Sequence, residues 1–208
     1  MTAFKIILPL VILTPFVVFG QPYSIKTSKD IYAQNKIIHY GSNIDSFHFR
    51  FTDESQAVDI WTNDYLHFNG KFLNFTKTYN QKTEKYYCQI IPLDTPTARY
   101  VYNLFLQFGI SQIPTQDSIQ GWQTGLDGGY YIFQYSISKN YHFKKYWSPD
   151  GFKNIKEAVL IDSISGQLWK DLKFHERWSK FIELLPFGCY EYSDGLSSCN
   201  KNDAKKRI

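Results

Sequence analysis

The stretch YLHFNGKFLNFTKTY, residues 65–79, decides the fold class. Apolar and polar side chains alternate on both sides of Asn69-Gly70, which is the strongest short-range signal of a two-residue β-hairpin. The expected pairing gathers four apolar side chains on one face, Leu66, Phe68, Leu73 and Phe75. Because the other face is much less apolar, we expect a sheet that is covered on one side.

Similar patterns extend this sheet in both directions along the chain. Further strands are expected at SFHFRF (46–51), AVDIW (57–61), EKYYCQIIPL (84–93), YYIFQYSI (130–137) and YHFKKYW (141–147), the last two joined by a turn at 138–140. Helical periodicity appears from Thr95, the expected N-cap, to Gly109, then from about 154 to 172, and again over 175–185. The order predicts an α+β domain, an antiparallel sheet built from hairpins with two or three helices packed on one face.

The amino end, MTAFKIILPLVILTPFVVFG, has the pattern of a cleavable secretory signal. Lys5 precedes an apolar run that is interrupted by Pro9 and Pro15 and is shorter than the roughly 20 residues that span a membrane. We therefore predict a signal peptide over 1–20, a single α+β domain over 21–200 and a basic, disordered tail over 201–208. The mature protein is expected to be secreted or periplasmic, with no membrane span after signal cleavage.

Three cysteines fit an oxidising compartment but leave one of them over. Cys189 and Cys199 flank a segment with an Asp194-Gly195 turn signal, so the hypothesis is a Cys189–Cys199 disulfide. Cys88 lies in an aromatic and β-branched run, where a buried thiol is the ordinary expectation.

Charge and motifs exclude several classes of function. The net charge of +4 is close to neutral, so nucleic acid is not an expected partner. There is no nucleophile elbow, P-loop, dinucleotide fingerprint or C-x-x-C pair. His175-Glu176 opens like a zinc-protease motif, but Ser179 stands where the second histidine belongs. No catalytic residue, metal site or cofactor is therefore predicted.

Two aromatic segments are the candidate ligand-binding sites. The long glycine-rich loop over 113–129 places Trp122 near Asp127, which suits an aromatic platform beside a carboxylate. The alternative is that Trp122 plugs the core and Asp127 caps a turn. Tyr146 and Trp147 are expected to point to opposite faces of a strand end, as a binding rim or as an ordinary connection to the next helix.

The segments IPTQDSIQGWQTGLDGGYY, YHFKKYWSPDG, KEA and ELLPFGCY resemble a loose family of uncharacterised secreted bacterial proteins. The resemblance covers residues 113–190, roughly the second half of the mature chain. It implies a bacterial cell-envelope location and supplies no activity and no catalytic residues.

Three functions remain open at this point. The first is a non-catalytic binding or interaction domain of the cell envelope, with an unknown envelope ligand or protein as its partner. The second is a hydrolase acting on glycan or peptide, with Asp117 and Asp127 as a carboxylate pair, which requires their carboxyls about 5 to 10 Å apart. The third is an inhibitor or immunity-type partner protein. The sequence does not determine the ligand or the oligomeric state.

Overall fold

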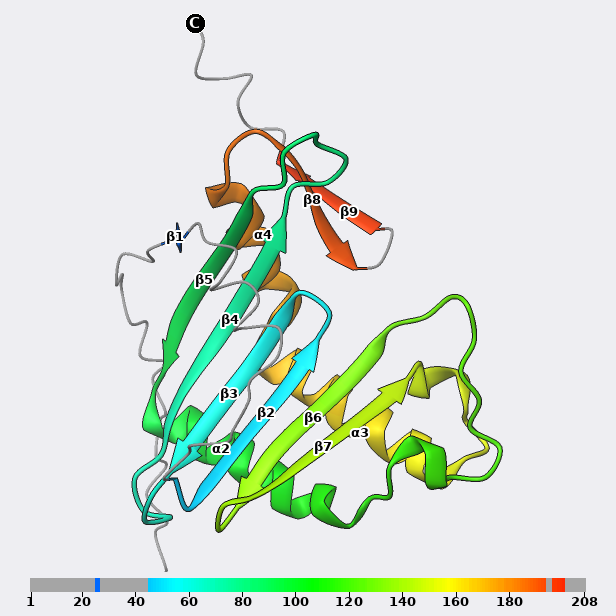
Figure 1. Cartoon of the computed structure of the whole chain (residues 1–208). Coiled ribbons are helices and arrows are strands. Elements are labelled where there is room, and N and C mark those ends of the chain that lie inside the picture. The colour runs from blue at the N-terminus through cyan, green and yellow to red at the C-terminus, as the bar shows by residue number, and fades with distance from the viewer. Residues whose placement is uncertain (1–24, 27–44, 194–195, 201–208) are drawn as a thin grey trace, which may run out of the picture.

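The computed structural model describes residues 25–26, 45–193 and 196–200, so the predicted signal peptide and basic tail lie outside the described residues (Figure 1). The main sheet is antiparallel, in the order β1-β5-β4-β3-β2-β6-β7, and a second sheet pairs β8 with β9. The strands are β1 (Ile25–Lys26), β2 (Phe47–Asp53), β3 (Gln56–Thr62), β4 (Asn69–Lys77), β5 (Tyr86–Leu93), β6 (Tyr130–Ile137), β7 (Asn140–Trp147), β8 (Gly188–Ser193) and β9 (Leu196–Asn200).

Three α-helices lie against one face of the main sheet, which confirms the predicted α+β class (Figure 1). They are α2 (Thr95–Gln107), α3 (Lys156–Asp171) and α4 (Phe174–Leu184), and short 3₁₀ turns form η1 (Ile110–Gln112), η2 (Gln116–Ser118) and η3 (Pro149–Gly151). The N-cap of α2 is Asp94, one residue before the expected Thr95, because the Asp94 carboxylate accepts a hydrogen bond from the Thr97 N–H at 2.9 Å. Gly109, with φ of 59°, follows the helix as predicted.

The core forms between the helices and alternate side chains of the central strands. In β2 the helix-facing residues are fully buried phenylalanines, Phe47, Phe49 and Phe51. The Phe105 ring of α2 lies 5.0 Å from Phe47 and 5.2 Å from Phe49, and Phe174 of α4 lies 5.9 Å from Phe51. Since successive side chains of a strand point to opposite faces, the residues between these phenylalanines lie on the face away from the helices.

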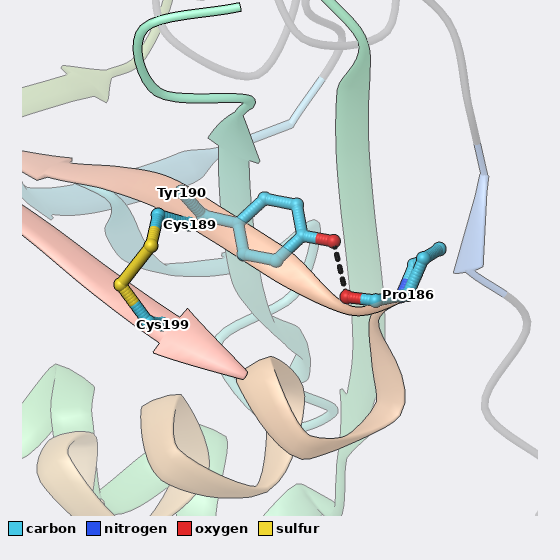
Figure 2. Close-up of a disulfide and its surroundings, with 4 residues drawn as sticks. All are labelled: Pro186, Cys189, Tyr190 and Cys199. Carbon is cyan, nitrogen blue, oxygen red and sulfur yellow. Dashed lines mark hydrogen bonds between the residues drawn. A yellow bond between two sulfur atoms is a disulfide. The ribbon is translucent and has the colours of Figure 1, made fainter. Parts of the chain in front are cut away.

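A disulfide-bonded hairpin packs at the end of β4. Cys189 and Cys199 occupy facing positions of β8 and β9 and form the disulfide, which confirms the predicted pairing, and Cys88 lies outside it, buried in the main sheet (Figure 2). The Tyr190 hydroxyl donates to the Pro186 carbonyl at 2.6 Å (Figure 2). Tyr190 packs in a second apolar cluster with Tyr87, Trp178, Phe181, Ile182 and Leu185.

The predicted hairpin turn at Asn69-Gly70 is wrong, although the strand after it is present. Both residues belong to β4, and the partner of β4 on this side is β3, with Gly70 opposite Ile60. The connection instead runs over 63–68 and is organised by Asp64, whose Oδ1 accepts from the N–H groups of Leu66 and His67 at 2.9 and 2.8 Å. Local Asp-to-backbone bonding of this kind competes with the turn signal of an Asn-Gly pair, and here it prevails.

Gly70 serves a packing role in place of the expected turn. A Cβ at this position would lie 3.2 Å from the Ala98 Cβ and 3.1 Å from the Ile60 Cγ2. The small pair Gly70 and Ala98 therefore lets α2 approach the sheet closely, and the same approach buries Phe68 at the start of the strand.

We expect Gly70→Ala to lower the free energy of unfolding by about 1 kcal/mol, because an added methyl overpacks the contact between β4 and α2. Gly166→Ala in α3 is the matched control, since a Cβ there meets nothing within 4 Å. It should raise stability by about 0.5–1 kcal/mol through helix propensity. Urea unfolding of the three proteins measures both effects, and equal stabilisation by the two substitutions would contradict the packing role.

Loss of the disulfide should destabilise the folded chain measurably. The bridge closes a loop with a sequence separation of 10, for which chain entropy gives about 2–3 kcal/mol. The double variant Cys189→Ala/Cys199→Ala should unfold at a correspondingly lower urea concentration. Dithiothreitol should lower the stability of the wild type and leave that of the double variant unchanged; equal sensitivity of the two proteins would show that the bridge contributes nothing.

Candidate functional site

Two of the four predicted ligand-binding residues lie in the core. Trp122 is 6% exposed and stacks on Tyr146, which is fully buried, at a centroid distance of 5.4 Å. The Trp122 indole N–H donates to the Trp147 carbonyl at 2.9 Å. Neither ring presents a face to solvent, so Trp122 has the core-plug position that was the alternative to a platform. A buried ring with a satisfied N–H is the usual state of tryptophan inside a domain.

The other two predicted residues lie nearer the surface. Asp127 is exposed, whereas Trp147 is half-buried under the backbone of the glycine-rich loop. A Cβ at Gly125 would lie 2.6 Å from the Trp147 ring, and one at Gly128 would lie 2.8 Å from it. The loop is glycine-rich because its backbone contacts this ring directly. Asp117, the proposed carboxylate partner of Asp127, is also exposed, and the pairing of the two stays a prediction.

The same loop is tied to β7 by buried polar side chains. The Lys144 ammonium donates to three carbonyl oxygens at 2.8, 3.1 and 2.6 Å, those of Ile110, Ser111 and Ile113. The Tyr146 hydroxyl donates to the Pro114 carbonyl at 2.8 Å. Burial lowers the pKa of Lys144 to about 8, because the charged form loses its solvent. All three donors of this amine are used, so Lys144 holds the loop rather than offering a nucleophile.

An aromatic surface remains on the face of β7 away from the helices. Alternate residues of this strand form it, and we call them the β7 row: Tyr141, Phe143, Lys145 and Trp147. Tyr141 and Phe143 are 43% and 46% exposed. The Lys145 ammonium lies 3.4 Å from the ring centroid of Tyr130 on the neighbouring strand, which fixes the lysine by a cation–π contact. The row therefore presents aromatic and cationic groups on a rigid strand.

The sequence shows the alternation of the β7 row but not the exposure of its aromatic side chains. Of its four members only Trp147, at the end of the strand, was predicted as a site residue. These side chains are exposed because β7 lies at the edge of the sheet. The order in which strands pair cannot be deduced from the local alternation of residues.

A buried charge cluster lies on the same face of the sheet, over β2, β3 and β4. The His48 Nε2 lies 2.6 Å from the Asp59 Oδ1, and its Nδ1 lies 3.2 Å from the Asp45 Oδ2. Burial alone raises the pKa of Asp59, but the hydrogen bond from His48 and the charges of His48, Arg50 and Lys71 hold it below the ordinary value. Both imidazole nitrogens face carboxylates, so neither is available to take a proton from a substrate.

A second titratable group, Asp53, is buried at the other end of β2. It is 5% exposed, and burial, with a smaller contribution from Glu54, raises the pKa of its carboxyl to about 7. The nearby Trp169 indole N–H opposes this rise in pKa. Burial raises the pKa values of Tyr131 and Tyr192, and the Asp53 charge adds to this rise. Sequence patterning did not identify Asp53, since its burial depends on the packing of distant elements.

A hollow of about 400 Å³ lies between the loop over 114–121 and the start of α3. Its lining mixes apolar and polar side chains of both segments, Pro114, Ser118, Ile119, Gln120, Gly121, Asn154, Ile155, Lys156 and Glu157. Within the described ranges, no three His, Cys, Asp or Glu side chains are placed to hold a metal ion. No helix in the described part of the chain is long and apolar enough to cross a membrane.

A scan against models of protein families finds no matching family, and a search of curated proteins finds no relative. Function is therefore inferred from the side chains of this chain.

The stability of the protein should fall as pH rises from about 4 to about 7. The folded state keeps the Asp53 proton up to pH about 7, while the unfolded chain releases it near the ordinary value of 3.8. The folded state therefore binds more protons in this window, and about 4 kcal/mol of stability is lost across it. Asp53→Asn should flatten this dependence and stabilise the protein above pH 7, as followed by urea unfolding between pH 4 and pH 8.

The exposed Asp127→Asn variant is the control and should keep the slope of the wild type. A wild-type stability that is constant or rises over this window, or a slope that survives in Asp53→Asn, would contradict the assignment to Asp53.

Proposed function

We propose that this chain is an exported, non-catalytic binding domain of the bacterial cell envelope, and that the β7 row is its contact surface. The observation that carries the proposal is the exposure of Tyr141 and Phe143 on a strand whose neighbouring side chains are locked. Aromatic residues are enriched in protein interfaces because they bury a large area with few rotatable bonds. Export rests on the amino-terminal pattern, and the Cys189–Cys199 disulfide is compatible with it.

The arrangement of ionisable groups also favours binding over hydrolysis as the role. The His48 nitrogens both face carboxylates, and the donors of Lys144 are all used by backbone carbonyls. These groups stabilise the scaffold that supports the β7 row. The contact surface is thus pre-organised, and little ordering entropy is left to lose on binding.

The test is a photo-crosslinking residue placed at Phe143 in the exported protein, with Leu106 of α2 as the matched control position. Leu106 is also an exposed apolar side chain, at 55%. We expect a specific adduct in the cell envelope from position 143 and none from position 106. The double variant Tyr141→Ser/Phe143→Ser should bind the crosslinked partner at least tenfold more weakly than the wild type and unfold at the same temperature. Leu106→Ser should bind it as the wild type does.

Two results would contradict the proposal. The first is equal adducts from both positions. The second is turnover of a glycan or peptide substrate by the purified protein that is abolished by Asp117→Ala or Asp127→Ala, which would establish the hydrolase alternative.

A further inference from the structure

β7 has an outer edge that no other strand occupies among the described residues, since it ends the order of the main sheet. The Ser148 N–H donates to the Gly129 carbonyl on the β6 side at 2.9 Å, which fixes the direction of every backbone group in the strand. Even-numbered residues point their N–H and C=O groups toward β6, and odd-numbered residues point theirs outward. The backbone groups of Phe143 and Lys145 therefore face away from the sheet.

The far end of this edge is already closed by two side chains. The Trp147 N–H donates to the Gln116 Oε1 at 2.6 Å, and the Trp147 carbonyl accepts from the Trp122 indole at 2.9 Å. In an antiparallel sheet, one residue of an added strand would accept a hydrogen bond from the Trp147 N–H and donate one to the Trp147 carbonyl. The side chains of Gln116 and Trp122 take these two roles here. The edge is thus closed by side chains at Trp147, and the outward-facing backbone groups of Lys145 and Phe143 come next along the strand.

The first half of β7 is accessible from several directions. The side chains of residues 140–143 are all exposed. They include two members of the β7 row, Tyr141 and Phe143, and the two residues that alternate with them, Asn140 and His142. The covering loop reaches the strand only from Lys144 onward, where the three carbonyl contacts begin. An extended segment can therefore lie beside Tyr141 and Phe143 without displacing the loop.

The positive charge at this edge favours an acidic partner. β7 contains no carboxylate, and its exposed cation is Lys145, with Lys139 exposed in the adjoining turn; the Lys144 ammonium is buried against the loop carbonyls. A second copy of the strand, paired antiparallel about Phe143, would bring a second Lys139 and a second Lys145 to this edge and no carboxylate to balance them. Like charges directly opposite destabilise a strand pair, whereas opposite charges stabilise it. A strand carrying carboxylates is the better complement.

We propose that the edge of β7 takes up an extended acidic segment of a partner protein as an additional antiparallel strand. The segment exchanges backbone hydrogen bonds with Phe143, sets carboxylates toward Lys145 and Lys139, and packs a side chain on the β7 row. Main-chain bonds then supply affinity and alternate side chains supply selectivity. This inference rests on the proposed function and names the partner of the same surface.

The probe is a library of ten-residue peptides with glutamate at alternate positions and random residues between, selected on the immobilised mature protein. A second library has lysine in place of glutamate. We expect enrichment from the glutamate library alone, with binding of the selected peptides measured by fluorescence anisotropy. Lys145→Glu should weaken this binding at least tenfold, and Lys153→Glu, at an exposed lysine outside β7, should change it little.

Backbone pairing is tested separately from side-chain contact. Phe143→Pro removes an outward N–H while keeping the bonds to β6, and proline is tolerated on an edge strand in that orientation. It should abolish binding, whereas Phe143→Leu should retain it. In the peptide, N-methylation of one set of alternate residues should weaken binding at least tenfold, and methylation of the other set should not.

Each other outcome overturns the strand-addition proposal in a distinct way. Enrichment from the lysine library, enrichment from neither library, or self-association of the protein through β7 would contradict the acidic partner. Binding that survives Phe143→Pro and both methylations but is lost in Tyr141→Ser/Phe143→Ser would leave the β7 row as a binding surface and exclude strand addition. If the wild-type protein bound no peptide at the β7 row and position 143 gave no adduct in the envelope, the proposed function would be contradicted as well.

Discussion

The alternation of side chains along β2 is the constraint on which the rest of the structure depends. One face of this central strand is a row of phenylalanines buried under α2 and α4, and the other carries His48 and Arg50. A slip of one residue in the pairing would place His48 and Arg50 among the aromatic rings and the phenylalanines among the buried polar groups of the second face. The cost of burying an uncompensated charge in an apolar core is several kcal/mol, so the register of the whole sheet is fixed at this strand.

The charge cluster on the second face is the complement of that aromatic core. Asp59 of β3 lies directly across from Arg50 of β2 and contacts His48 and Lys71, so one carboxylate joins three strands. The hydrogen bond from His48, together with the surrounding positive charges, outweighs the desolvation of the carboxylate and lowers the pKa of Asp59. Side chains that resemble catalytic groups in isolation thus act here as register-specific contacts. The contact surface that we propose lies instead at the edge of the sheet, on β7.

The long loop between α2 and β6 connects the core to that edge. Trp122 enters the core and closes the end of the β7 ladder with its indole N–H, while Lys144 holds the start of the loop through three carbonyls. The glycines later in the loop allow its backbone to contact the Trp147 ring. The residues that look like a ligand platform in the sequence are therefore largely structural, and the exposed aromatic side chains are their neighbours in β7, Tyr141 and Phe143.

The sequence by itself determined the fold class, the positions of six strands, β2 to β7, the helices α2, α3 and α4, and the Cys189–Cys199 pairing, because each follows from local periodicity, capping or a short closed loop. It misplaced the turn before β4, where the bonding of Asp64 to nearby N–H groups and the approach of Ala98 to Gly70 decide the path. Of the candidate site it contained Trp147 and the alternation around it. The burial of Trp122 and Asp53 and the edge position of β7 depend on contacts between segments far apart in the chain. Only the tertiary structure decided these, because strand order and burial are properties of the assembled sheet and not of any single segment.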